Sequence, residues 1–417
     1  MNDSAPQAAA EAVLETLPLF EMARMRAATA PRRHRVHGFA GEGPESTMRW
    51  VNQFTHTRRL LGPDDREVVT PSNDTLYTNA WLDLSNGPVV IEVPEMGDRY
   101  WTLGFLDAWT NPWAYAGRRT TGGAAQRLFV HGSGWNGDAP DGMHIIAAPG
   151  DDVWIIGRIL ADNTEADLAA VHQLQDLFQI ERTDGSDAVS RVDVMLAGRR
   201  TGTPDHGEYI RVVDQMMARN PPAHEVAHWP PPIDGLAAAL EKTYTRLRSD
   251  AQPSDVGGGW TIAVMVRTDF GDDFQTRAQV ARNWIGTLGI DEAMYVMAEV
   301  DANGEVLDGS RRYVLQFPLD GEPEVDAFWS VTLYRSSDRL LVANPIGRYS
   351  IGDRTPGLHR DAGGGLSLSI HADDPGAGRN WLPAPRGEPF YLTLRLYQPR
   401  RSHLDRSFRY PPVTRLD

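Results

Sequence analysis

The chain has 417 residues, a formal net charge of −15 and no cysteine. The lack of cysteine excludes disulfides, thiolate metal sites and a cysteine nucleophile, and an acidic chain without a long basic run argues against nucleic-acid binding. Its single lysine, Lys242, leaves little scope for Schiff-base catalysis. A hydrophobic share of 41% and a charged share of 23% indicate a globular chain, long enough for two or three domains.

The N-terminal residues and the composition lead us to expect a cytoplasmic, β-rich protein. Residues 1–20 lack the basic region of a secretion signal and carry glutamate within their apolar run. No apolar run approaches the roughly 20 residues of a membrane span, so we expect no membrane contact. The 39 glycines and 29 prolines predict many turns, as a β-rich architecture requires.

An N-terminal helical segment, residues 1–44, is predicted first. Apolar side chains at helical spacing predict a helix over residues 8–28, with Pro18 as a kink or a break. The polar stretch that follows holds Asn52 and His56, which share one face if that stretch is helical. We consider His56 a candidate general base, because imidazole titrates near neutral pH, and Asn52 a candidate substrate contact. A hydrogen-bonded structural histidine is the alternative.

Residues 70–113 are the densest stretch of the chain. Even positions from Leu76 to Leu84 are mostly apolar and odd positions are polar or aromatic, which is the alternation of a half-buried strand. Two further apolar runs follow after turns rich in Asn, Asp and Gly. Together they predict a β-meander with strands over residues 75–84, 88–93 and 99–109.

Polar and aromatic side chains gather on and around these strands. Rigid aromatics beside hydrogen-bonding groups suit a pocket that desolvates and orients a small molecule. In this interpretation Asp74 orients His56 and Tyr77 stabilises an oxyanion. The predicted substrate contacts of the stretch are Asn73, Trp81, Asp107, Trp109 and Trp113. The alternative is structural, with a turn cap at residues 73–74, packing by Tyr77 and a strand end at Asp107.

The middle of the chain, residues 161–254, is predicted to be helical, and one loop in it matches a metal motif. Residues His224, Glu225 and His228 fit the HExxH pattern of zinc peptidases. That chemistry requires a helix, because both histidines must bind one metal from one face while the glutamate activates water. Pro222 and Pro230 leave barely more than one helical turn between them. We therefore interpret this stretch as an exposed inter-helix loop, with a zinc site as the weaker alternative.

From residue 255 the composition returns to short strands with glycine and proline turns, which predicts a sandwich. Two polar clusters, at residues 344–349 and 380–385, stand out in it. Arg348 could clamp a carboxylate or stabilise an oxyanion. Asn380 is a candidate substrate contact, and Trp381 could wall a pocket. The structural alternative is a brace between Arg348 and Asp353, with Trp381 filling the sandwich.

Several long motifs resemble a bacterial two-part family. The stretch NDTLYTNAWLDLSNGPVVIEVP…RYWTLGFLDAWTNPWAYAGRRTTG resembles domain of unknown function 1254. The stretches GDDFQTRAQVA, DAFWSVTLYR, NPIGRYSIGDRTPGL and NWLPAPRGEPFYLTLRLYQP resemble its usual partner, domain of unknown function 1214. The resemblance implies a mainly β fold with a helical insert. It implies an immunoglobulin-like β-sandwich over residues 45–160, a small α-helical segment over 161–254 and a jelly-roll-like β-sandwich over 255–417. It implies no particular reaction.

Three hypotheses of function follow. The first is a cofactor-free enzyme that adds water to a small aromatic or carbonyl-bearing metabolite, as a hydrolase or a hydratase/lyase, near the inter-domain face. Its catalytic residues are His56, Asp74, Tyr77 and Arg348. The second is a carbohydrate- or protein-binding β-sandwich module without catalysis, and the third is the zinc hydrolase. We expect a small-molecule substrate, no cofactor, no nucleic-acid or membrane partner, and possible homo-oligomers.

Overall fold

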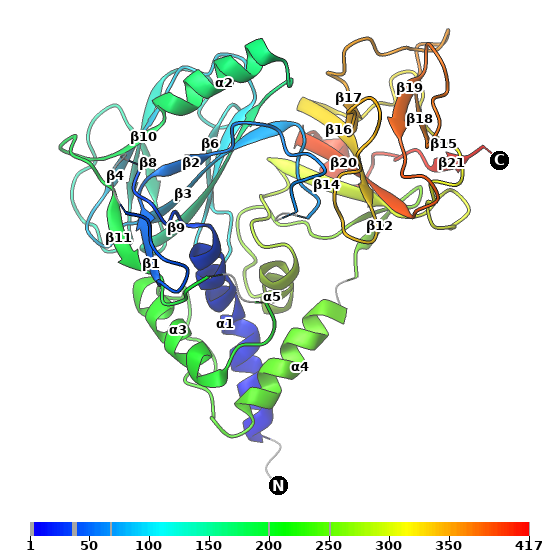
Figure 1. The fold of residues 1–417 in the computed structure, drawn as a ribbon. Helices are drawn as coiled ribbons and strands as arrows, with labels where there is room; N and C mark the ends of the chain where they lie inside the picture. The colour runs from blue at the N-terminus through cyan, green and yellow to red at the C-terminus, as the bar shows by residue number, and fades with distance from the viewer. Residues whose placement is uncertain (1–3, 36–39, 67–68, 199–200, 250–251, 417) are drawn as a thin grey trace. The chain divides into compact units, whose positions relative to one another are not determined.

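The computed structural model describes residues 4–35, 40–66, 69–198, 201–249 and 252–416, and within them the fold is mainly β, with 21 strands and six helices (Figure 1). The chain forms two compact units, and each unit is built from three segments that alternate with those of the other unit along the sequence. The N-terminal unit comprises Met1–Arg58, Leu76–Ala251 and Thr268–Thr287. The C-terminal unit comprises Arg59–Thr75, Gln252–Arg267 and Leu288–Asp417. The predicted fold class, mainly β with a helical insert, is confirmed.

Two larger sheets build the N-terminal unit, together with a short ribbon of β1 (Met48–Val51) and β11 (Ser190–Asp193). The five-stranded sheet has the order β2 (Phe54–His56), β3 (Thr75–Asp83), β9 (Asp152–Leu160), β5 (Trp101–Leu106) and β6 (Ala114–Gly117). The four-stranded sheet has the order β10 (Gln179–Arg182), β4 (Val89–Val93), β7 (Gln126–His131) and β8 (His144–Ala147).

The predicted β-meander is wrong, although its three strands exist. β3 and β4 lie in different sheets, and β9 lies between β3 and β5. β9 is buried along almost its whole length and contains Gly157, where a Cβ atom would lie 2.1 Å from the Thr78 carbonyl oxygen. A glycine is therefore required where β9 approaches β3. The alternation of apolar and polar residues predicts which face of a strand is buried, but it does not predict which strands lie beside it in the sheet.

Four helices of the N-terminal unit share one apolar cluster. They are α1 (Ser4–Thr29), α3 (His206–Arg219), α4 (Leu236–Ser249) and α5 (Phe274–Asn283). α1 continues through Pro18 as one helix and buries Val13, Leu17 and Phe20 completely. In Figure 1, α2 (Glu165–Leu177) lies away from these four helices, and its first turn is capped by Thr164, whose hydroxyl accepts from the Asp167 amide.

The C-terminal unit is a sandwich of two sheets. The larger sheet has the order β12 (Ser254–Gly257), β13 (Trp260–Ile262), β14 (Ala293–Ala298), β20 (Phe390–Pro399), β16 (Val325–Arg335) and β17 (Ser350–Gly352). The smaller sheet has the order β19 (Asn380–Pro383), β18 (Leu366–His371), β15 (Tyr313–Phe317) and β21 (Val413–Arg415). A short helix, α6 (Arg401–Leu404), follows β20.

Alternation along β16 separates the core of this sandwich from its outer face. Trp329, Val331 and Leu333 belong to the core cluster that spans both sheets. Ser330 and Thr332 point the other way and are nevertheless buried. The outer face of the larger sheet is therefore polar and covered, and residues 70–74 supply contacts to it. We call these residues the strap.

Candidate functional site

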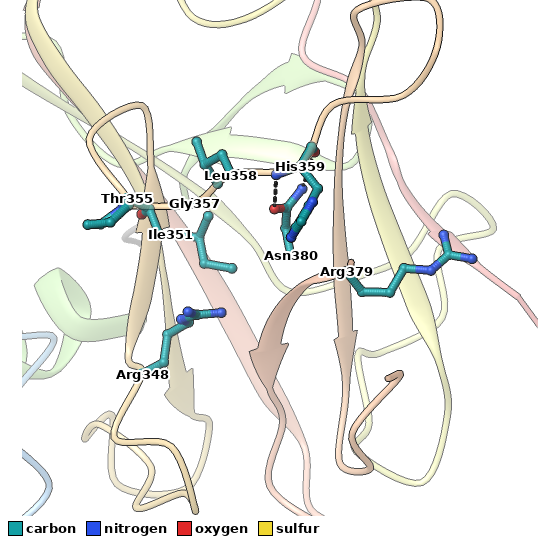
Figure 2. A pocket seen from close by; sticks show the side chains of 9 residues that line it. Arg348, Ile351, Thr355, Gly357, Leu358, His359, Arg379 and Asn380 are labelled. Carbon is teal, nitrogen blue, oxygen red and sulfur yellow. Dashed lines mark hydrogen bonds between the residues drawn. The ribbon is translucent and has the colours of Figure 1, made fainter. Parts of the chain in front are cut away.

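A hollow of about 120 Å³ opens in the C-terminal unit between β17, the loop after it and the start of β19 (Figure 2). Side chains from all three segments line it, and the polar ones are Arg348, Thr355, His359, Arg379 and Asn380. The described residues that line it include two arginines and a histidine but no aspartate or glutamate. With Arg348 reaching toward the strand that carries Asn380 and no acidic side chain among the described lining residues, the hollow favours a negatively charged occupant. We call this hollow the Arg348 pocket.

Arg348 is held so that part of its guanidinium stays available. Nη1 donates to the Trp381 carbonyl oxygen at 3.1 Å, and the Arg348 amide donates to Asn344 Oδ1 at 3.0 Å. Asn344 Nδ2 in turn donates to the Arg348 carbonyl at 2.8 Å. Within the described chain, Nε and Nη2 of Arg348 have no protein acceptor. That edge of the guanidinium can bind a carboxylate or phosphate through two parallel hydrogen bonds.

Asn380 fixes the opposite wall. Its Nδ2 donates to the carbonyls of His359 and Ser367 at 2.8 and 2.9 Å, and its Oδ1 accepts from the His359 amide at 2.9 Å. The side chain is buried and its hydrogen bonds are used within the protein, so it positions His359. Figure 2 shows Arg348 reaching toward the strand that carries Asn380, whereas the Arg379 guanidinium points away from the hollow. Trp381 is buried and donates from Nε1 to the His371 carbonyl, in keeping with its structural alternative.

Asp74 and Asn73 belong to the C-terminal unit, unlike His56 and Tyr77. Asp74 is 4% exposed and accepts from Ser330 Oγ at 2.7 Å, with Arg354 Nη2 at 3.4 Å from its other oxygen. Asn73 Nδ2 donates to the Leu61 carbonyl at 2.6 Å. The partners of Asp74 are thus a serine and an arginine, where the sequence interpretation gave it a histidine.

The structure does not bring His56 and Tyr77 into one pocket. His56 pairs with Thr78 across the β2–β3 ladder, and its Nδ1 lies 3.2 Å from Thr78 Oγ1. Cross-strand partners share a face and successive residues alternate, so Tyr77 points to the opposite face of the sheet. Burial and, to a smaller extent, the nearby Arg58 lower the pKa of His56 to about 4. The prediction that His56 and Tyr77 act together is therefore wrong, because the β2–β3 register places them on opposite faces of the sheet.

The other predicted contacts of the N-terminal unit have structural partners. Asn52 is fully buried and spans the Asp83 backbone, accepting from its amide and donating to its carbonyl. Trp81 stacks on Trp154 with ring centroids 5.1 Å apart. The Trp109 indole donates to the Asn220 carbonyl, and the Trp113 indole donates to the Ala147 carbonyl. The Asp107 carboxylate accepts from two backbone amides.

Asp107 is the carboxyl of this group, and its surroundings shift its pKa. Burial raises its pKa to about 6, although the Asn111 side chain, two backbone amides and the nearby Arg277 favour the ionised form. Its oxygens accept from the amides of Trp109 and Asn111 at 2.9 and 2.8 Å and from Asn111 Nδ2 at 2.9 Å. These contacts close the turn after β5, which is a sufficient structural reason for an aspartate there.

The HExxH stretch has neither the helix nor the convergence that zinc needs. Residues 224–228 lie outside any helix, between α3 and α4. His224 Nε2 lies 2.8 Å from Glu15 Oε1, and His228 Nε2 lies 3.2 Å from Glu11 Oε2, so the two imidazoles meet different carboxylates on α1. Within the described ranges, no group of three or more His, Cys, Asp or Glu side chains could hold a metal ion. The interpretation as an inter-helix loop fits this geometry.

Of the residues discussed at this pocket, Arg348 and Asn380 were candidates from the sequence, whereas His359, Arg379 and Arg354 were not. The cluster of Asn, Pro, Gly and Arg around residue 344 was the signal for Arg348. His359 and Arg354 stand in a loop rich in charge and glycine, which has no periodicity to single them out.

No helix in the described part of the chain is both long and apolar enough to cross a bilayer.

Two family descriptions match the chain. Residues 51–182 match "Protein of unknown function (DUF1254)", and residues 292–401 match "Protein of unknown function (DUF1214)". No curated protein matches.

Solved structures extend the comparison to the whole chain. The crystal structure of the VPA0106 protein from Vibrio parahaemolyticus is similar over 99% of this chain and 100% of its own, with 22% identity and a TM-score of 0.72, so the two share a fold. A putative uncharacterized protein from Burkholderia cenocepacia aligns over 99% of this chain and 93% of its own, with 12% identity and a TM-score of 0.44. With its two matches in this order, the chain belongs to the two-part family in which domain of unknown function 1254 precedes domain of unknown function 1214.

Proposed function

We propose that the C-terminal unit binds a small organic anion, through a carboxylate or phosphate group, in the Arg348 pocket. The observation that carries the proposal is a guanidinium with an open donor edge in a hollow whose described lining has no acidic side chain. Arginine suits planar oxyanions better than lysine does, because its fork matches two oxygens at once.

The size of the hollow limits its occupant. A space of about 120 Å³ is below the 300–1,000 Å³ that is typical for drug-sized ligands. It therefore accommodates a small anion, or the charged end of a larger molecule whose remainder stays in solvent. Ile351 and Leu358 add apolar surface beside the charged groups, which suits an organic acid.

This proposal keeps the predicted role of Arg348 as a carboxylate clamp and leaves out the predicted general base. Water addition requires an acid–base group within reach of the bound molecule. His56 lies in the other unit, and its partner there is Thr78. His359 is the lining residue with suitable chemistry, so catalysis at this pocket would depend on it. The proposal is closest to the predicted binding module, with a small anion in place of a carbohydrate or a protein.

Isothermal titration calorimetry tests the proposal with acetate, succinate, benzoate and inorganic phosphate as probes. A charge-assisted hydrogen bond contributes about 1.5–3 kcal/mol, so Arg348→Ala should weaken binding about 10- to 100-fold. Arg348→Lys keeps the charge but loses the fork, and an intermediate affinity is expected. Arg386→Ala is the matched control, because Arg386 pairs with Asp373 on the exposed surface of the same unit. The proposal is refuted if the wild type binds none of the four anions, or if Arg348→Ala binds them as well as the wild type.

A further inference from the structure

Asp74 lies on the outer face of the larger sheet, beside the turn that forms one wall of the Arg348 pocket. Its Oδ2 accepts from Ser330 Oγ at 2.7 Å and its Oδ1 lies 3.4 Å from Arg354 Nη2. Ser330 pairs with Gly352 across the β16–β17 ladder. The carboxylate of the strap therefore lies over the point where β17 ends and the turn begins.

The turn itself is closed by local hydrogen bonds. The Gly352 amide donates to Thr355 Oγ1 at 2.9 Å, and the Thr355 amide donates to the Gly352 carbonyl at 3.0 Å. Asp353 Oδ1 accepts from the Trp329 amide at 3.2 Å, which ties the turn to β16. Gly352 must be glycine, because a Cβ atom there would lie 2.0 Å from the Trp329 carbonyl oxygen.

The residues that follow this turn line the pocket. Thr355, Leu358 and His359 all line the hollow. Arg354, one residue before Thr355, is about a third exposed, lies over the Phe328 ring at 4.1 Å and meets Asp74. The ion pair thus holds the segment whose next residues form the wall.

We propose that Asp74 is a positioning residue for the Arg348 pocket, and that it holds the wall at residues 355–359 through Arg354. This inference rests on the proposed function for its effect on binding. Asp74 lies within the stretch that matches domain of unknown function 1254, yet it would determine ligand affinity at a pocket within the stretch that matches domain of unknown function 1214.

Residues 70–72 of the strap make further hydrogen bonds to the larger sheet, so Asp74 can be replaced without detaching the strap from that sheet. Thr70 Oγ1 lies 2.7 Å from Tyr391 Oη, and Tyr334 Oη donates to the Pro71 carbonyl. Ser72 Oγ lies 3.2 Å from Tyr397 Oη. Arg395, which is almost fully buried, donates from Nη2 to the Thr70 carbonyl at 2.9 Å.

Hydrogen exchange on the full chain without ligand is the first experiment. The amides of Gly352, Thr355 and His359 report on the wall, because each donates a hydrogen bond within it or to Asn380. Asp74→Ala should speed their exchange about fivefold or more, which corresponds to about 1 kcal/mol. Arg354→Ala should do the same, and the double variant should add little, since both remove one interaction.

Thr70→Val is the control for this experiment, because it removes a strap contact on Tyr391 away from the turn. It should leave the three amides unchanged. Unchanged exchange in Asp74→Ala, or additive effects in the double variant, would overturn the inference.

Calorimetry with benzoate and inorganic phosphate is the second experiment. Asp74→Ala should weaken binding about fivefold or more while its melting temperature stays close to that of Thr70→Val, and Asp74→Glu, which keeps the charge, should recover part of the affinity. Unaltered affinity in Asp74→Ala would overturn the link to binding. Should the wild type bind none of the four probe anions, the proposed function fails, while the exchange comparison still decides whether Asp74 holds the wall.

Discussion

Replacing Asp152 should destabilise the N-terminal unit more than any surface charge would. Asp152 is 2% exposed at the start of β9 and accepts from Arg26 on α1. Arg219 at the end of α3 donates to both of its oxygens, at 2.9 and 2.7 Å, and Asn220 Nδ2 donates at 2.9 Å. The carboxylate therefore joins two helices to the central strand of the five-stranded sheet.

The magnitude follows from the charges involved. Arg26, Arg219 and Asn220 outweigh the cost of burial and lower the pKa of Asp152 from 3.8 to about 2, which corresponds to about 2 kcal/mol of stability at neutral pH. Asp152→Ala loses this contribution and also leaves Arg26, 3% exposed, without its carboxylate. Breaking a buried ion pair in this way costs about 3–5 kcal/mol.

Urea unfolding of the full chain at pH 7 measures the loss. Asp176→Ala is the matched control, because Asp176 pairs with Arg58 on the exposed surface of the same unit and should cost about 1 kcal/mol or less. The folded pKa of Asp152 is below the unfolded value, so its contribution is complete above pH 3.8 and is lost as pH falls toward 2. A loss below about 1 kcal/mol for Asp152→Ala at pH 7 would refute this account of the cluster.

Two further measurements check other parts of the structure. Because burial raises the pKa of Asp107 to about 6, its contribution to stability is complete below pH 3.8 and is lost as pH rises through 6; carbon-13 NMR of the carboxyl should give a midpoint near 6, and a midpoint near 4 would contradict its burial. Gly157→Ala should cost about 3 kcal/mol, because its Cβ would lie 2.1 Å from the Thr78 carbonyl oxygen. Gly62→Ala, with no atom within 4 Å, should melt at the wild-type temperature, and equal melting of both variants would disprove the close approach.

Local sequence patterns predicted the positions of individual strands well, but they predicted poorly which strands pair within a sheet. Alternation predicted a strand over residues 75–84 and another over 366–372, and the structure has β3 at Thr75–Asp83 and β18 at Leu366–His371. The strand beside β3 on its inner side is β9, which follows much later in the chain. A hydrophobic pattern records which face is buried and carries no information on which distant strand completes the sheet.

The candidate site shows the same limit. Arg348 and Asn380 were predicted because polar side chains cluster around each of them, and both line the Arg348 pocket. Asp74 was grouped with Tyr77 because the two are three residues apart, yet the unit boundary falls between them. Proximity in sequence could not reveal that the chain changes units there.

The alternation of the two units along the chain has a consequence for synthesis and for gene shuffling. The N-terminal unit is complete only when Thr268–Thr287 has been made, and by then Arg59–Thr75 and Gln252–Arg267 of the other unit already exist. At roughly 5–20 residues per second on the ribosome, the helical cluster must wait many seconds for α5 to join α1. No single cut in the gene yields either unit intact, so a single crossover cannot exchange one unit without dividing the other.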